Sequence, residues 1–141
     1  MAELVARVYT IERHPALARL AEERLQNMGY CNVHVRIGDG TLGWPEAAPF
    51  DAIIAAASGP RVPEALKRQL AIGGRLIMPV GETLDHQHLI RLTRTGEDAY
   101  DSETLDEVMF VPLIGEQGWD ESAHESRALR RRTRFRCAYR T

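Results

Sequence analysis

The chain has 141 residues, a mass of 15.9 kDa, 18 basic and 20 acidic side chains, and 44% hydrophobic residues. This length suits a single domain, and this hydrophobicity argues against disorder of the whole chain. Its 2 cysteines, Cys31 and Cys137, are too few for a disulfide scaffold. Its longest apolar run, residues 52–57, is far shorter than the ~20 residues of a membrane helix. We therefore expect a cytoplasmic protein without a membrane partner.

The charges are distributed unevenly along the chain. Residues 1–121 carry 11 basic and 19 acidic side chains, a net charge of −8, whereas residues 122–141 carry 7 arginines and 1 acid, a net charge of +6, which together give −2. An acidic body does not attract nucleic acid, so we do not expect a nucleic-acid partner. We expect one domain at residues 1–119 and an Arg-rich, disordered tail at residues 120–141.

The apolar pattern predicts an alternation of strands and helices along the domain. In chain order it predicts a strand at 8–11, a helix at 15–28, strands at 32–37 and 51–57, a helix at 63–70, and strands at 75–80, 88–95 and 107–113. The nearly continuous apolar run at 51–57 is typical of a strand buried on both faces of a parallel sheet. The last two strands, joined by an acidic loop, should be antiparallel. This order predicts an open, doubly wound, Rossmann-like α/β fold, with a mostly parallel sheet and an antiparallel last strand.

Candidate ligand-binding residues follow the ends of the predicted strands, where open α/β sheets bind ligands. Glu12 follows the first strand, and its carboxylate can accept hydrogen bonds from two ribose hydroxyls. Alternatively, Glu12 is only a charge at a helix N-terminus, which stabilises the helix by ~0.3–1 kcal/mol. Asp39, between two glycines, can reach an exocyclic amine or simply form an Asp-Gly turn.

The remaining polar residues indicate no catalytic group. His86 and His88, beside Asp85, can be drawn as metal ligands, but an HxH pattern in a polar loop is more often solvated, so no metal is expected. No serine, cysteine or lysine stands in a recognisable nucleophile motif. The residues leave the catalytic groups unknown.

Five segments in a fixed order carry a family resemblance. They are VYTIER (8–13), NVHVRIGDG (32–40), GWPEAAPFDAIIAAA (43–57), VPEALKRQLAIGGRLIMPVG (62–81) and VMFVPLIGEQGW (108–119). The chain resembles, over residues 2–119, the protein-L-isoaspartate O-methyltransferases, class I enzymes that use S-adenosylmethionine to repair age-damaged aspartyl residues. The resemblance implies methyl transfer from S-adenosylmethionine to the isoaspartyl carboxylate of proteins and peptides.

The resemblance also implies roles for individual residues. By it, Glu12 holds the ribose hydroxyls of the cofactor, and Asp39 with Gly40 borders the adenine. The strand end Ala55, Ala56 and Ala57 would face the substrate backbone. The VPLIGEQ segment, with Ile114 and Gln117, would fold back near the active site.

The start of the chain departs from the family pattern. Family members carry a first strand with a glycine-rich cofactor loop and, further upstream, a serine-containing loop, whereas 7 residues precede VYTIER here and no GxGxG occurs. We therefore expect an N-terminally truncated methyltransferase domain whose strands at 8–11 and 51–57 have unpaired edges. We also expect weak binding of S-adenosylmethionine and little activity. The alternative is a non-catalytic α/β module that acts through its surface or basic tail, and the oligomeric state stays undetermined.

Overall fold

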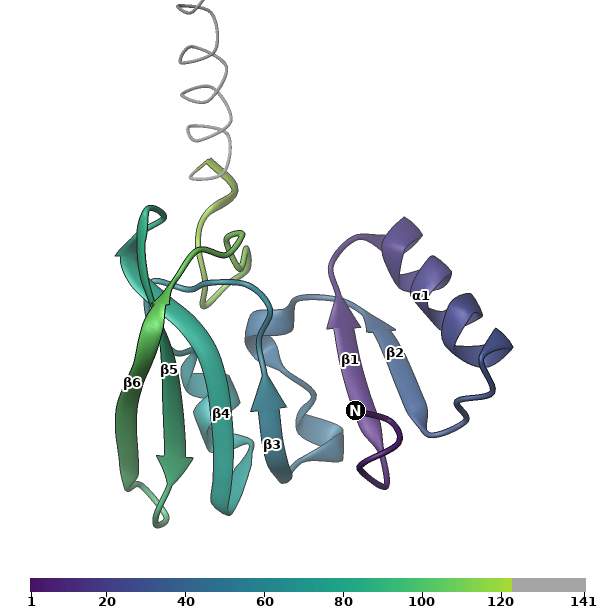
Figure 1. Cartoon of the computed structure of the whole chain (residues 1–141), viewed down its shortest axis with the longest axis horizontal. Helices are drawn as coiled ribbons and strands as arrows, with labels where there is room; N and C mark the ends of the chain where they lie inside the picture. The colour runs from purple at the N-terminus through teal and green to yellow at the C-terminus, as the bar shows by residue number, and fades with distance from the viewer. Residues whose placement is uncertain (123–141) are drawn as a thin grey trace, which may run out of the picture.

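The computed structural model describes residues 1–122 (Figure 1). Its elements are β1 (Val8–Glu12), α1 (Pro15–Asn27), β2 (Val33–Ile37), the 3₁₀ turns η1 (Gly40–Leu42) and η2 (Pro45–Ala47), β3 (Phe50–Ile54), α2 (Glu64–Arg68), β4 (Leu70–Thr83), β5 (His86–Arg94) and β6 (Tyr100–Val108). Within residues 1–122, no helix is both long and apolar enough to cross a membrane. Residues 123–141, most of the predicted Arg-rich tail, lie outside the described residues, so the predictions made for the tail remain predictions.

The strands form a two-stranded and a four-stranded sheet. β1 runs parallel to β2 and β3 parallel to β4, whereas β4–β5 and β5–β6 are antiparallel. The predicted α/β class and the antiparallel end of the sheet are therefore confirmed. The two sheets lie side by side, with β1 and β3 as neighbouring edges (Figure 1). Among the described residues, β1 pairs only with β2 and β3 only with β4, which confirms the expected unpaired edges.

The hydrophobic core lies in the four-stranded half of the molecule. Its buried members come from α2, β4 and β5, and are Leu66, Leu70, Leu76, Met78 and Leu92. These side chains meet because α2 packs on β4 and because alternate residues of β4 point to the same face of the sheet. The four-stranded sheet is therefore the part of the fold with the densest apolar packing.

Few side chains are buried in the half that contains α1. The helix starts at Pro15, where a missing N–H costs no hydrogen bond, and it ends before Gly29, whose φ of +82° suits glycine. α1 packs on β1 and β2, but in this helix only Ala18 is buried. Leu17 and Leu20 remain 53% and 41% exposed, so the predicted helix forms without covering its apolar face.

The third strand is shorter and more exposed than predicted. β3 ends at Ile54, so the run Ala55 to Ala57 lies beyond it. The expectation of burial on both faces is wrong in the described structure, because Asp51 and Ala52 are exposed and Ile54 is 57% exposed. The faces of a parallel strand are covered by helices, and within residues 1–122 α1 packs on β1 and β2 and α2 on β4, which leaves the side chains of β3 partly exposed.

Two further boundaries differ from the prediction. The second helix covers only Glu64–Arg68, and β4 begins at Leu70, so Gly73 and Gly74 lie inside the strand and do not separate the helix from it. The prediction of a strand at 107–113 is also wrong. The last strand is β6, at Tyr100–Val108, and it consists mostly of the segment that was predicted to be an acidic loop. An edge strand with exposed side chains can carry many acids, because only its backbone pairs with the sheet.

Replacing Leu76 with alanine should lower the free energy of unfolding by about 2–5 kcal/mol, because the side chain is fully buried and its loss leaves a cavity. The matched control Leu105→Ala removes a side chain that is 43% exposed on β6 and should cost less than about 1 kcal/mol. Urea denaturation followed by circular dichroism measures both values. An equal decrease in the free energy of unfolding in the two variants would contradict the placement of Leu76 in the core.

Candidate active site

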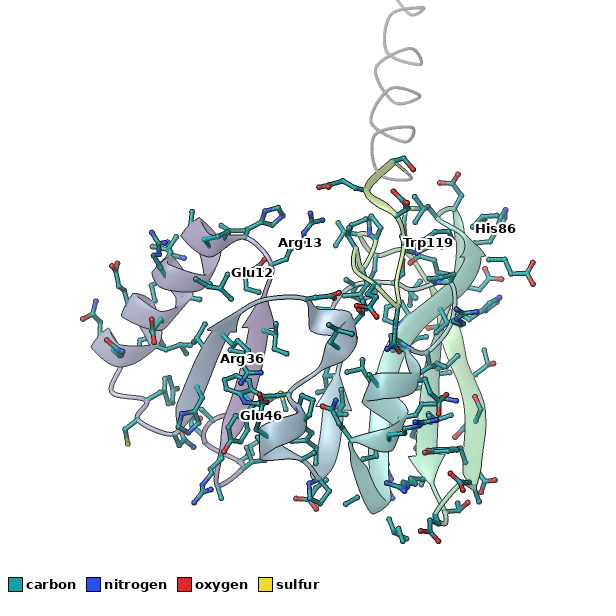
Figure 2. The ribbon with its side chains drawn as sticks, turned by 180° about the vertical axis from the view of Figure 1, so that it is seen from behind. Glu12, Arg13, Arg36, Glu46, His86 and Trp119 are labelled. Carbon is teal, nitrogen blue, oxygen red and sulfur yellow. The ribbon has the colours of Figure 1, made fainter. Side chains whose placement is uncertain are left out.

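The parallel pairing of β1 and β2 brings two of the predicted carboxylates to one edge. Glu12 is in register with Ile37, and the Gly38 N–H donates to the Glu12 carbonyl at 3.1 Å. Asp39 therefore stands two residues beyond the strand partner of Glu12, at the carboxyl end of the same sheet. Glu12 and Arg13 lie at the end of β1, at the same end of the molecule as Trp119 (Figure 2).

The Glu12 carboxylate is held by the start of α1. Its Oε1 accepts a hydrogen bond from the His14 N–H at 2.8 Å, and His14 is the residue before the first helical position. This bond satisfies a backbone donor at the helix N-terminus, in line with the helix-start interpretation of Glu12. It also fixes the direction of a half-buried carboxylate, so the helix contact and a ligand-binding role are compatible.

Asp39 is the most heavily bonded carboxylate at this edge. Its Oδ1 accepts from the Thr41 N–H at 2.8 Å and the Thr41 hydroxyl at 2.7 Å, and its Oδ2 accepts from the Glu116 N–H at 2.8 Å. Burial works to raise the pKa of Asp39, but the bonds from Glu116 and Thr41 and the nearby Arg13 guanidinium together lower it below the usual range. The carboxylate is therefore held in its charged form, as an anchor for the segment that contains Glu116.

The segment after β6, which includes VPLIGEQ, folds back onto Asp39 and Thr41. The Gln117 N–H donates to the Thr41 Oγ1 at 3.1 Å, and Ile114 forms an isolated bridge with Trp119. At Gly115 the Asp39 carboxylate occupies the space that a Cβ would need, so only glycine fits there without movement. Gly40 lies nearby, where an added Cβ would approach Leu113 Cδ1 at 3.7 Å. The structure thus brings Asp39, Gly40 and Gln117 together.

The run Ala55 to Ala57 connects β3 to the same folded-back segment. The Ala55 N–H donates to the Ile77 carbonyl at 3.0 Å, which continues the pairing with β4. Directly after the run, Ser58 exchanges backbone bonds of 2.8 Å with Val111 and Leu113. The predicted substrate-side residues therefore lie on two segments that meet at Ser58.

Two buried glutamines that the sequence reasoning missed hold the loops of this region. Gln69 accepts from the Trp44 N–H at 2.7 Å and donates to the Leu42 carbonyl at 2.9 Å, which fixes the turn after Asp39. Gln87 bonds both backbone groups of Phe110, at 2.7 and 3.1 Å, where the folded-back segment begins. No sequence signal marks either residue, because Gln69 follows Arg68 and Gln87 stands between two histidines, and only the folded chain buries them.

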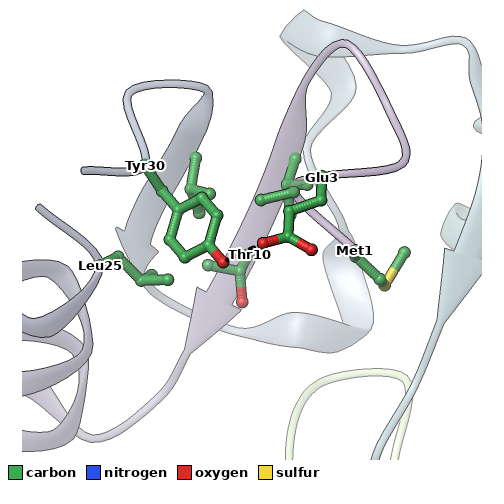
Figure 3. A pocket seen from close by; sticks show the side chains of 8 residues that line it. Met1, Glu3, Thr10, Leu25 and Tyr30 are labelled. Carbon is green, nitrogen blue, oxygen red and sulfur yellow. Dashed lines mark hydrogen bonds between the residues drawn. The ribbon is translucent and has the colours of Figure 1, made fainter. Parts of the chain in front are cut away.

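Other polar features lie apart from this edge. A hollow of about 310 Å³ opens between the N-terminal segment, α1 and the β1–β2 pair (Figure 3). Its lining residues, Met1, Ala2, Glu3, Val8, Thr10, Leu25, Tyr30 and Val33, include none of the predicted site residues. His86 and His88 lie on β5, and residues 1–122 contain no group of three or more side chains arranged to hold a metal.

Replacing Asp39 with asparagine should lower stability most near neutral pH. Because the folded pKa of Asp39 is lowered, its carboxylate stabilises the fold above the unfolded value of about 3.9, and this contribution is lost as the pH falls through the folded value. The difference in unfolding free energy between wild type and Asp39→Asn should therefore shrink from pH 7 to pH 3. Denaturant titrations at several pH values measure it, with Asp101→Asn on exposed β6 as the control. A difference that does not change with pH would contradict the assigned state of Asp39.

Comparison with known proteins places this arrangement in a family. The family described as "Protein-L-isoaspartate(D-aspartate) O-methyltransferase (PCMT)" matches residues 1–118. A protein-L-isoaspartate O-methyltransferase of Magnetococcus marinus is 55% identical over 120 residues, which are 85% of this chain and 52% of that protein. One of Protochlamydia amoebophila is 50% identical over 123 residues, 87% of this chain and 59% of that protein.

A solved structure agrees with these sequence matches. The putative protein-L-isoaspartate O-methyltransferase of Plasmodium falciparum, in complex with S-adenosyl-L-homocysteine, superposes with a TM-score of 0.68 at 26% identity, over 78% of this chain and 53% of that chain. The chain spans about half the length of the curated relatives it matches. With residues 1–118 matched, the chain belongs to the protein-L-isoaspartate (D-aspartate) O-methyltransferase family.

Proposed function

We propose that this chain contributes to a protein-L-isoaspartate O-methyltransferase, which transfers a methyl group from S-adenosylmethionine to an isoaspartyl carboxylate in a damaged protein or peptide. The observation that carries the proposal is the register of β1 and β2, which puts Glu12 and Asp39 at one sheet edge. Family membership and the Plasmodium relative's complex with S-adenosyl-L-homocysteine support the choice of cofactor.

The donors and acceptors at this edge fit a nucleoside. Glu12 is oriented by His14 through Oε1, and a charged carboxylate in this position suits the paired hydroxyls of a ribose. A carboxylate has about four acceptor positions, and the three bonds from Thr41 and Glu116 leave one on the Oδ2 of Asp39. That position suits one N–H of an exocyclic amine, while Gly40 allows a flat ring to come close to the backbone.

The reaction requires little acid–base chemistry from the protein. When bound, S-adenosylmethionine supplies an electrophilic methyl group on a sulfonium. The isoaspartyl carboxylate is already ionised near neutral pH, so its oxygen can attack that methyl carbon without a general base. The transfer would form a C–O bond as the C–S bond breaks, with the electron pair left on sulfur. Catalysis then rests on alignment of the two groups and exclusion of water, which agrees with the lack of a recognisable nucleophile motif.

The substrate-side assignment follows the two segments that meet at Ser58. We assign Ala55, Ala56 and Ala57, together with Ile114 and Gln117, to the side that faces the isoaspartyl peptide. In support, the folded-back segment lies close to Asp39 through the Glu116 bond of 2.8 Å, so a peptide bound along it would lie near the nucleoside edge.

Replacing Glu12 with glutamine tests the nucleoside assignment. Loss of the charge should weaken binding of S-adenosyl-L-homocysteine about tenfold or more, because hydrogen bonds to a charged acceptor contribute about 1.5–3 kcal/mol each. Glu22→Gln, on α1, is a matched control that should bind like wild type. Isothermal titration calorimetry on the 141-residue chain measures the affinities.

The same titration tests the expectation that the wild-type chain binds S-adenosyl-L-homocysteine weakly. Without a glycine-rich motif, the chain should bind the ligand more weakly than micromolar, since that loop lets the backbone approach the cofactor. Micromolar binding by wild type would contradict this expectation. Equal affinities of Glu12→Gln and wild type would contradict the role of Glu12.

A further inference from the structure

The side chain of Thr41 connects two segments that the proposed function places on opposite sides of the reacting groups. Thr41 is fully buried at 0% exposure. Its hydroxyl donates to Asp39 Oδ1 at 2.7 Å and accepts from the Gln117 N–H at 3.1 Å. The hydroxyl therefore uses its one hydrogen as a donor and an oxygen lone pair as an acceptor, so it bridges the two segments directly.

The hydrogen-bonded chain continues beyond Thr41 on both sides. Asp39 also accepts from the Glu116 N–H at 2.8 Å, so two successive amides of the folded-back segment are held, one by Asp39 and one by Thr41. On the far side, Gln117 Oε1 accepts from the Ala65 N–H of α2 at 3.0 Å. The segment is thus fixed between the end of β2 and the first turn of α2.

We propose that Thr41 is a positioning residue, whose hydroxyl holds the Gln117 amide directly and the Glu116 amide through the Asp39 carboxylate, to which it donates. This inference rests on the proposed function, in which Asp39 faces the cofactor and Gln117 the substrate. A fixed spacing between the two sides matters because methyl transfer depends on alignment at near-attack distance. Thr41 acts through its neighbours and touches neither reacting group.

The variants Thr41→Val and Thr41→Ser distinguish the effect of the hydroxyl from the effect of the side-chain shape. Valine keeps the shape of threonine but leaves the Gln117 N–H without its acceptor and Asp39 without one donor, whereas serine keeps the hydroxyl. Amide hydrogen exchange by NMR, on the full chain without ligand, should be about tenfold faster at Glu116 and Gln117 in Thr41→Val and near wild type in Thr41→Ser. The amide of Met78, a buried core residue, reports whether the fold is intact.

If Thr41→Val exchanges at Glu116 and Gln117 as slowly as Thr41→Ser, the proposal is overturned. If the Met78 amide shows that Thr41→Val has lost its fold, Gly115→Ala supplies a second test, because its Cβ would push against the Asp39 carboxylate from the other side. Faster exchange in Gly115→Ala at Gln117, whose amide is coupled to the Asp39 carboxylate through the Thr41 hydroxyl, supports the proposal. Exchange as slow as in wild type overturns it.

Addition of S-adenosyl-L-homocysteine separates the positioning role from the proposed function. In wild type and Thr41→Ser, saturating ligand should slow exchange at Glu116 and Gln117 at least threefold, and in Thr41→Val it should have a smaller effect. Equal slowing in all three proteins overturns the coupling through Thr41. An absence of slowing at every amide in wild type counts against the proposed function, while the measurement without ligand still decides whether Thr41 holds the segment.

Discussion

The carboxylate of Asp39 is the point on which the arrangement of the candidate site depends. It lies two residues beyond the end of β2, caps the following 3₁₀ turn through Thr41, and holds the segment after β6 through the Glu116 amide. These segments are more than 70 residues apart in sequence, yet one side chain sets their spacing. Because the hydrogen bonds and Arg13 keep Asp39 charged, the anchor is stronger than one made by a neutral side chain.

The two halves of the molecule are stabilised to different degrees. The four-stranded sheet with α2 contains a core of fully or nearly buried leucines and a methionine, whereas α1 and its two strands bury mainly Ala18. A cluster of aromatic rings connects the halves. The ring centroid of Tyr9 in β1 lies 5.8 Å from the ring centroid of Phe50 in β3 and 5.1 Å from that of Trp44. The edge that carries Glu12 and Asp39, proposed to bind the nucleoside, thus belongs to the less buried half, whereas Gln69 and Gln87 of the better packed half anchor the loops around it.

Polar side chains, more than apolar ones, determine where the loops of the site lie. Gln69, Gln87 and Asp39 each bond backbone groups of a loop that has no regular secondary structure of its own. Buried backbone groups need such partners, since leaving one unpaired costs about 1–3 kcal/mol. Loops fixed in this way suit the proposed methyl transfer, which depends on alignment of the reacting groups.

The sequence by itself determined the family, the α/β class, the order of the elements, and the carboxyl-end positions of Glu12 and Asp39. These follow from local patterns: apolar periodicity, Pro15 and Gly29 at the ends of α1, and ordered motifs such as GDG and VPLIGEQ. Only the tertiary structure decided that the acidic segment of β6 is a strand and that the apolar run of β3 is partly exposed. Strand pairing and burial depend on which neighbours are present, and local composition does not contain that information. For the same reason the bonds from Thr41 to Gln117 and from Asp39 to Glu116 emerged only once residues distant in the chain were brought together.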